Sequence, residues 1–428
     1  MPSTTVFRSL RHRNARIFFA GLLASTIGSW VQMTAMALLV YDVTGNATDT
    51  GLNLLCQFLP MLLLGGWAGA VADRRDRRRM ALLTQFLQAL QALVLGVITL
   101  SGVVNIPLLY GLSLTLGVIG AFDNPARRGF VIELVEPDEI GNAMSLNTAV
   151  MTGSRVVGPA IAAILVGVVD YGWLFIANAV SFMAILSSLL AIDVSTLHRA
   201  PRAPRGGRPV REAAAFVARN RRLRVVFAVF TVVGTFAFNY SVSLLALADV
   251  RFERRAAFGL LLSVTGAGSV IGSLLTARLG RVTTGWFYGM GALLGVSGLA
   301  VAWAPALWVA LVAAVPVGIG GAAFVAAQNI ILQQESPPEM RGRLLAFGAV
   351  AFLGSTPVGA PVTGLIADRI SAEWSLGYGS VISLGACAVG WWRRRVDPSR
   401  STTMRHADSP SATLHLDGRL DGGDVVPT

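Results

Sequence analysis

Long apolar runs separated by short polar segments occupy the chain from about residue 17 to residue 392. Each run is roughly 20 residues or longer, the length that an α-helix needs to cross a bilayer. The pattern predicts an all-α membrane protein with about twelve transmembrane helices. We expect the first six at 17–41, 50–72, 80–101, 106–126, 143–168 and 172–192, and the other six at 224–248, 256–277, 285–304, 306–330, 344–367 and 374–392.

The longest polar stretch inside this pattern, 193–223, separates six predicted helices from six. Its helical spacing of Val210, Ala214 and Val217 predicts a cytoplasmic linker with a short amphipathic helix at the membrane interface. The predicted domains are therefore an N-terminal six-helix bundle, the linker, a C-terminal six-helix bundle and a polar tail that we expect to be disordered. Their bounds are 1–192, 193–223, 224–396 and 397–428.

The two predicted bundles share short sequence matches in the same order. Gly153-Ser-Arg-Val-Val-Gly158-Pro aligns with Gly354-Ser-Thr-Pro-Val-Gly359-Ala, and Gly28-Ser-Trp aligns with Gly234-Thr-Phe. A duplicated membrane bundle is typical of transporters whose binding site lies between the two copies. We therefore expect two pseudo-symmetric six-helix bundles around a central cavity.

Composition excludes several classes of function. Hydrophobic residues make up 54% of the chain and charged residues 14%, which disfavours a water-soluble enzyme. All 35 basic residues are Arg, so neither a P-loop lysine for ATP nor a lysine Schiff base is present. The two cysteines, Cys56 and Cys387, lie in apolar stretches, and the four histidines lie in polar ones. We expect no metal site and no cofactor.

The net charge of +12 is explained by topology. If the N-terminus is cytoplasmic, 30 of the 35 arginines fall on the cytoplasmic side, as the positive-inside rule requires. We therefore expect both termini in the cytoplasm of a bacterial cell and the spans in its inner membrane, with no role in nucleic-acid binding. Arg251, Arg254 and Arg255 are the exception on the outer side, where Asp249 and Glu253 partly offset them.

The predicted loop between the second and third spans carries an ordered motif, Gly69-Ala-Val-Ala-Asp73-Arg74-Arg-Asp76-Arg-Arg78-Arg79-Met. A plain positive-inside loop explains the arginines but not this order of glycine, aspartate and arginine. The motif resembles the loop signature of the major facilitator superfamily, Gly-x-x-x-Asp-Arg-x-Gly-x-Arg-Arg. Asp76 replaces the second glycine, as in the branch of enterobactin-exporter-like and macrolide-efflux-like proteins. Gly28-Ser-Trp30-Val-Gln32 and Phe122-Asp123-Asn-Pro125 also resemble that branch.

The resemblance implies an inner gate. Gly69 would allow close helix approach, and Asp73, Arg74, Arg78 and Arg79 would form a charge network that holds the outward-facing state. Asp123, at the inner end of the fourth span, is the expected partner of these arginines, because a partly desolvated carboxylate needs a cation. The alternative is an ordinary salt bridge at a helix end, which contributes less than about 1 kcal/mol.

The fifth span carries small residues around a proline at Ser154, Gly158 and Pro159. These positions resemble the antiporter motif of the superfamily, Gly-x-x-x-Gly-Pro, which implies a tight outer closure and antiport. Generic packing of small residues, which is common between membrane helices, remains the alternative.

Arg155 is the most unusual residue, because it lies near the middle of the fifth span. Inserting a guanidinium there costs about 2.5–3.5 kcal/mol, so it is expected to face the bundle interior. Two roles stay open: it binds an anionic group of the substrate, or it is a structural arginine satisfied by carbonyls and polar side chains.

Other polar and aromatic residues within the spans are candidates for the cavity wall, because a mostly apolar cavity with a few polar groups suits amphiphilic substrates. A hydrogen bond between helices is the alternative for each of them. With Arg155, the candidates are Trp30, Gln32, Asn53, Gln57, Asn147, Asn239, Tyr240 and Gln328.

Together these features predict a monomeric secondary active transporter rather than an enzyme. The resemblance implies proton-coupled efflux of amphiphilic drugs or macrolides by alternating access. Export of a siderophore or another anionic metabolite is the competing hypothesis. A nutrient importer and a non-transporting membrane scaffold are further alternatives. A membrane-embedded enzyme would need a buried histidine, an acidic pair or a nucleophile elbow, and the spans contain none of these.

Overall fold

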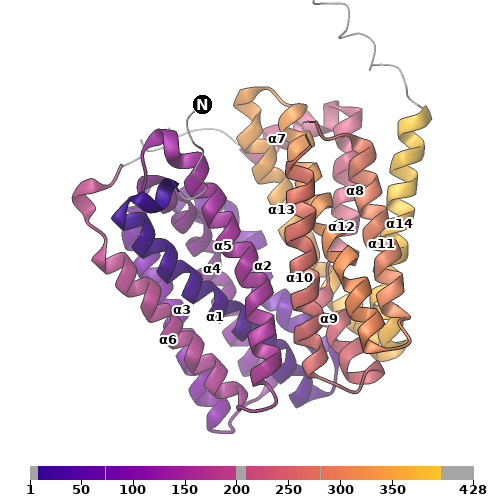
Figure 1. Ribbon diagram of the computed structural model, residues 1–428, viewed down its shortest axis with the longest axis horizontal. Helices are drawn as coiled ribbons and strands as arrows, with labels where there is room; N and C mark the ends of the chain where they lie inside the picture. The colour runs from indigo at the N-terminus through magenta and orange to yellow at the C-terminus, as the bar shows by residue number, and fades with distance from the viewer. Residues whose placement is uncertain (1–7, 73, 199–208, 280, 397–428) are drawn as a thin grey trace, which may run out of the picture.

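The computed structural model describes residues 8–72, 74–198, 209–279 and 281–396, and over these residues every regular element is a helix (Figure 1). The long helices of the N-terminal half are α1 (Arg13–Thr44), α2 (Ala47–Ala72), α3 (Arg77–Leu100), α4 (Ile106–Glu133), α5 (Ile140–Leu165) and α6 (Tyr171–Ala191). The C-terminal half contains α8 (Arg221–Ala237), α9 (Tyr240–Ala246), α10 (Ala256–Ala277), α11 (Thr284–Ala302), α12 (Leu307–Gln334), α13 (Pro338–Arg369) and α14 (Ala372–Val396).

Ten helical segments of the described chain are long and apolar enough to cross a membrane. They include all six long helices of the N-terminal half, and the segment Arg221–Arg251 counts as one of them. Helices α13 and α14 are also long, at 32 and 25 residues, but are not among the ten. The all-α membrane fold is therefore confirmed, while the total of twelve spans stays a prediction that depends on α13 and α14.

Polar side chains define where many of the helices begin. Asp76, Asn105 and Asp170 accept hydrogen bonds from backbone N–H groups in the first turns of α3, α4 and α6, which are otherwise without partners. Gly45 ends α1 in the left-handed region, at φ 68°, and its N–H bonds to the carbonyl of Tyr41. These caps explain why most helix boundaries fall close to the ends of the apolar runs.

The seventh predicted span, expected as one helix over 224–248, is broken. Helix α8 stops at Ala237, and α9 begins at Tyr240 and continues into a π-helical turn, η4 (Leu247–Arg251). At the break, the Asn239 amide nitrogen donates to the carbonyl of Thr235, 2.8 Å away. Because the side chain satisfies a carbonyl that the helix would otherwise pair, the backbone is free to change direction. Discontinuous helices of this kind commonly line transporter binding sites.

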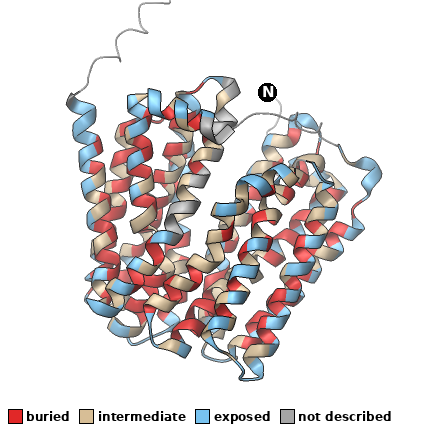
Figure 2. Cartoon of the chain, turned by 180° about the vertical axis from the view of Figure 1, so that it is seen from behind, coloured by how far each residue is buried: buried red, intermediate tan, exposed pale blue. Residues whose placement is uncertain are grey.

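The helices form two groups that correspond to the two halves of the chain (Figure 1). Within each group, buried residues line the interior of the bundle (Figure 2). Between the groups, the main contacts are α2 with α13 and α5 with α10. These two contacts are equivalent, because in each of them the second span of one half packs against the fifth span of the other half. The contacts agree with the pseudo-symmetry expected from the repeat.

The two bundles meet closely at one end of the molecule, which we call the sealed end. There, a Cβ atom on Gly364 of α13 would lie 2.5 Å from the carbonyl oxygen of Ala47, and one on Gly259 of α10 would lie 2.5 Å from that of Pro159. Only glycine permits such close backbone approach. Toward the opposite end, which carries α7 (Pro209–Arg219) and which we call the linker end, the two bundles diverge (Figure 1). On α2, Leu63 and Trp67 are 69% and 62% exposed.

Helix α7 (Pro209–Arg219) lies where the linker sequence predicted an amphipathic helix. Its Ala213 and Val217 side chains are buried in the core of the C-terminal bundle, and it packs against α8 and α13. The predicted helix is therefore present, and of the residues on which the prediction rested Val217 is buried against protein. Its position at the membrane interface stays a prediction. The Val210 side chain and the tail 397–428 lie outside the part of the chain that is described.

Candidate functional site

The loop between α2 and α3 lies at the linker end, and two of its five arginines, Arg77 and Arg78, bind to other helices of the N-terminal bundle. Arg78 donates through Nε to the carbonyl of Leu189, 2.8 Å away, and caps the last turn of α6. Arg74 and Arg79 are exposed. Asp73, the aspartate of the predicted gate, lies outside the described residues. Arg78 thus stabilises a helix end, where cations are favoured.

Arg77, which the sequence motif did not single out, makes the ion pair of this loop. Its Nη1 lies 3.1 Å from a carboxylate oxygen of Glu133 at the end of α4, and both side chains are mostly buried. A Cβ on Gly129 of α4 would lie 2.6 Å from Arg77 Nε, so the guanidinium packs directly on that helix. The pair links α3 to α4. Helix α4 extends seven residues beyond its predicted end at 126, and this extension, which the sequence analysis missed, brings Glu133 to the loop.

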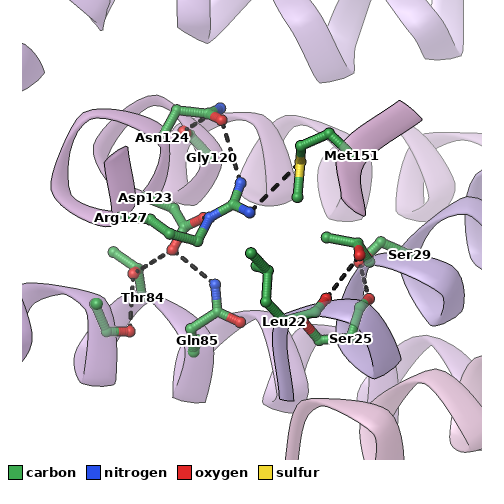
Figure 3. Close-up of polar contacts among 12 residues, drawn as sticks. Leu22, Ser25, Ser29, Thr84, Gln85, Gly120, Asp123, Asn124, Arg127 and Met151 are labelled. Atoms are coloured by element: carbon green, nitrogen blue, oxygen red, sulfur yellow. Dashed lines mark hydrogen bonds and ion pairs between the residues drawn. The ribbon is translucent and has the colours of Figure 1, made fainter. Parts of the chain in front are cut away.

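Asp123 does not pair with the loop arginines as expected. Its carboxylate accepts hydrogen bonds from Thr84 Oγ1 and Gln85 Nε2, each at 2.8 Å, and forms an ion pair with Arg127 Nε at 3.2 Å (Figure 3). Arg127 is one helical turn along on α4 and reaches Met151 of α5. The carboxylate is 4% exposed and is satisfied by its neighbours on α3 and α4. Arg127, four residues along the same helix, therefore forms the ion pair that we predicted for the loop arginines.

Gly69 also differs from the expectation. A Cβ atom at this position would meet no atom within 4 Å, so the helix does not approach another element here. The same is true of Gly65 and Gly66 on the same stretch of α2. In this conformation these three glycines face open space, so close packing at Gly69 would require a different arrangement of the helices.

The small residues of α5 pack against both bundles. Ser154 is fully buried and shares a 2.8 Å hydrogen bond with Thr26 of α1. Gly158 lies directly against Trp30, where a Cβ would overlap the tryptophan side chain. Pro159 faces α10 through Gly259. The motif therefore packs one face of α5 against α1 and another face against α10 of the other bundle, close to the sealed end.

Arg155 lies between the two bundles. Its backbone carbonyl faces Gly266 of α10, and its guanidinium carbon lies 5.0 Å from the centre of the Trp30 ring, a cation–π distance. The side chain is exposed to solvent although it lies deep in the protein, so a solvent-accessible space reaches it. Among the described residues, its guanidinium has no hydrogen-bond or carboxylate partner. Tyr240 of the C-terminal bundle lies within electrostatic range.

Three further candidates in the C-terminal bundle carry buried polar atoms that lack hydrogen-bond partners within the described chain. They are the Tyr240 hydroxyl, the Asn239 amide oxygen and both polar atoms of the Gln328 side chain. Gln328 has no exposed surface. Leaving such a group unpaired costs about 1–3 kcal/mol, so each marks a place where the structure has retained polarity at a cost in stability.

Other predicted cavity residues serve packing instead. Gln32 is buried in a network within the N-terminal bundle, where it donates to Gln91 and accepts from Asn178 at 2.7 Å. Asn53 is 2% exposed and accepts from Ser113 of α4. The alternative interpretation, a hydrogen bond between helices, holds for both in this conformation.

The remaining candidates differ in their surroundings. Asn147 is buried on α5, and Gln57 is half-buried on α2, where its backbone contacts Gly117 of α4. Trp30 is half-buried beneath Arg155. The structure therefore brings Trp30 and Arg155 together within the N-terminal bundle, while Tyr240 belongs to the C-terminal bundle.

The sealed end carries ionic contacts across the two bundles. Asp42, at the end of α1, pairs with Arg255, which precedes α10. Arg255 also binds Asp249 at 2.9 Å, and that hydrogen bond raises the pKa of Arg255, so the residue stays charged. Arg251 pairs with Glu373 at 2.8 Å. Two of the three arginines that broke the positive-inside pattern are thus held by carboxylates.

Comparison with known families and proteins agrees with this architecture. The family model described as transmembrane secretion effector matches residues 4–426. Macrolide efflux protein A of Streptococcus pyogenes is 23% identical, and the match covers 85% of this chain and 92% of that protein. Multidrug efflux pump Tap of Mycolicibacterium fortuitum is 28% identical, with 82% and 88% covered. The staphyloferrin A transporter of Staphylococcus aureus is 24% identical, with 62% and 67% covered.

Solved structures share the fold at low sequence identity. A POT family transporter in complex with a thioalcohol-conjugated peptide superposes with a TM-score of 0.72 at 11% identity, over 91% of this chain and 97% of that one. A bacterial homologue of the human lysosomal transporter Spinster, in an inward-facing and unoccupied conformation, gives 0.68 at 14% identity, over 90% and 97%. These likenesses establish the arrangement of the helices.

Proposed function

Because the chain belongs to the transmembrane secretion effector family of major facilitator transporters, we propose that it exports amphiphilic small molecules across a bacterial inner membrane by alternating access. It is a multi-pass membrane transporter and not an enzyme. The relatives named above include a macrolide efflux protein and a multidrug efflux pump, which supports outward transport of drug-like molecules. The observation that carries the mechanism is that the two bundles meet closely at one end and diverge at the other.

The proposed orientation places the linker end in the cytoplasm, with both termini. The arginine distribution supports it, because positive residues concentrate at the linker end. In this orientation the structure is open toward the cytoplasm and closed toward the outside, the state in which an exporter takes up its substrate. Closing the linker end and opening the sealed end would release the substrate outside.

Asp123 is the proposed site of proton coupling. It is a buried carboxylate in an ion pair, so protonation would remove the charge that holds Arg127 and leave the guanidinium free to rearrange. Thr84 and Gln85 connect the same carboxylate to α3, next to the loop that begins at Arg74. A proton arriving at Asp123 would therefore change contacts between α3, α4 and α5 at the cytoplasmic side.

An accumulation assay tests the proposal. The protein is expressed in an efflux-deficient bacterial host, and the retention of a panel of macrolides, dyes and other amphiphiles is measured with and without an uncoupler. We expect lower accumulation of at least one compound than in cells with empty vector, and loss of this difference with the uncoupler. Efflux that persists without a proton gradient would reject proton coupling but not export. No difference for any compound would count against drug efflux.

A second candidate substrate is an anionic secreted metabolite, such as a siderophore. The uncompensated guanidinium of Arg155 favours it, and one relative is named as a staphyloferrin A transporter. The same host, fed with anionic and cationic members of the panel, separates this candidate from export of cationic drugs.

A further inference from the structure

We propose that Arg155, Trp30 and Tyr240 form a subsite that binds the oxyanion of an amphiphilic substrate and thereby links the two bundles. The proposal rests on the transport function proposed above and specifies the charge of the molecule that is carried. Arg155 lies on α5 and Trp30 on α1, both in the N-terminal bundle, and Tyr240 begins α9 in the C-terminal bundle.

The guanidinium is oriented but not satisfied. Trp30 lies 5.0 Å below it, which occupies one face of the planar group and leaves its N–H edge available. Within the described chain no carbonyl or carboxylate accepts from that edge. The structural role for Arg155, in which backbone carbonyls satisfy it, therefore lacks its contacts. A carboxylate or phosphate fits the edge, because both accept two parallel N–H bonds from a guanidinium.

Tyr240 supplies a hydroxyl from the opposite bundle. The hydroxyl is buried, has no hydrogen-bond partner among the described residues and lies within electrostatic range of Arg155. A hydroxyl donates readily to an oxyanion, so an anion beside Arg155 would satisfy both groups after a shift of the Tyr240 side chain that exposes its buried hydroxyl. Since they belong to different bundles, such a ligand would favour the conformation that holds them together.

The wall beside Tyr240 suits an apolar body. The Phe238 ring packs 5.8 Å from the Tyr240 ring and 5.0 Å from that of Phe352, and both phenylalanines are half-buried. A Cβ added to Gly321 would lie 3.4 Å from both the Phe238 ring and the Tyr240 hydroxyl, so the glycine adds no bulk there. A molecule with an anionic head and an apolar or aromatic body would place its head at Arg155 and its body along this wall.

Local charge disfavours a cation at the same place. On this side of the N-terminal bundle Asp123 and Arg127 neutralise each other, and the neighbouring Arg128 is a further cation. The unpaired guanidinium therefore sets a positive potential in the solvent-accessible space around it. Anions are concentrated there and cations are excluded.

The test compares three ligands with one apolar body and different charges: 1-pyrenebutyrate, 1-pyrenebutyramide and 1-pyrenebutylamine. The full-length protein is placed in nanodiscs of zwitterionic lipid, so that anionic headgroups do not compete, and binding is followed by pyrene anisotropy. We expect the anion to bind at least about tenfold more tightly than the amide, and the cation to bind most weakly. The variant R155A should lose the preference, R155K should keep part of it, and Y240F should weaken only the anion severalfold.

Arg254→Ala is the matched control, because it removes an exposed arginine near the sealed end. It should leave all three affinities unchanged. The proposal is overturned if the wild-type protein shows no preference for the anion, if the cation binds as well, or if R155A keeps the full preference while eluting as a folded monodisperse protein. Because binding is read without transport, this result is independent of whether the accumulation assay detects export.

Discussion

Asp368, in the last turn of α13, accepts a hydrogen bond at 2.8 Å from the backbone N–H of Ala47, the first residue of α2 in the other bundle. The same carboxylate also accepts from the N–H and hydroxyl of Thr48. It therefore caps a helix across the bundle interface. A cap that exists only when the two bundles touch contributes directly to the stability of the closed sealed end.

We expect Asp368→Ala to open the sealed end about fivefold more often, because losing a cap costs about 1 kcal/mol. The measurement is the rate of maleimide labelling of A360C, which is buried at this seam, in a protein without Cys56 and Cys387. Asp170→Ala is the control. It removes a cap of the same type from α6 at the same end but within one bundle, and labelling should not rise.

The ion pair of Asp42 with Arg255 should make closure of the sealed end sensitive to salt. The pair is partly exposed, and such pairs contribute roughly 0.2–1 kcal/mol. At 1 M salt the Debye length is about 3 Å, so wild-type labelling of A360C should increase modestly. The variant R255Q should label faster at low salt and lose the salt response. An R255Q protein that responds to salt like the wild type would show that this pair does not contribute.

The buried pair of Asp123 and Arg127 should give non-additive effects on stability. Asp123→Leu leaves Arg127 buried without its carboxylate, which is expected to cost about 3–5 kcal/mol. The double variant D123L/R127M replaces both charges by apolar groups and should be much closer to the wild type in thermal stability. Melting of the three proteins in the same detergent gives the answer. Equal losses in the single and double variants would mean that the ion pair is not the relevant contact.

Gln328→Met should stabilise this conformation. The wild-type amide is fully buried and unpaired within the described residues, and methionine has a similar shape without the polar atoms. A gain of about 1 kcal/mol corresponds to a rise in Tm of roughly 2–4 °C. Asn53→Leu is the control, because that amide oxygen accepts from Ser113, and its loss should lower the Tm. A lower Tm for Q328M would indicate a partner for the amide.

Two glycines at equivalent places in the repeat should not tolerate alanine. A Cβ on Gly158 would overlap Trp30 of α1, and a Cβ on Gly359 would overlap the carbonyl of Thr235 of α8. Both substitutions should lower the Tm by several degrees, since the overlap is with the Cβ of Trp30 or with backbone, neither of which can move easily. A Cβ on Gly69 would face open space, so Gly69→Ala should leave the Tm unchanged. The same substitution should lower transport if the linker end closes around Gly69 during the transport cycle. Tolerance of both G158A and G359A would contradict the packing described above.

The sequence singled out chemically unusual residues, but it did not identify their partners. It singled out Asp123, but the residues that hold the carboxylate, Thr84 and Gln85, lie on another helix. Arg127 was within reach of a sequence argument, because residues four apart share a helix face. Arg251 and Arg255, which departed from the positive-inside pattern, both form ion pairs. Their partners, Glu373 and Asp42, lie far away in the chain.

Gln32 and Asn53 show a limit of reading polar residues from sequence. A glutamine in an apolar span looks the same whether it faces a cavity or a neighbouring helix, because both environments require hydrogen bonds. Only the positions of Gln91, Asn178 and Ser113 assigned these two residues to packing.

The sequence by itself determined the membrane helices, the two related halves and the family. The length of an apolar run, the distribution of charged residues and a short motif can each be recognised in a single sequence, without knowledge of tertiary contacts. The tertiary structure alone decided which end is sealed, where the seventh span breaks, and which polar groups are left unsatisfied. Those features depend on the approach of α13 to α2 and of α10 to α5, contacts between residues about one hundred or more positions apart. Arg155 belongs to both descriptions: the sequence indicated the cost of burying it, and the structure placed its guanidinium over the Trp30 ring.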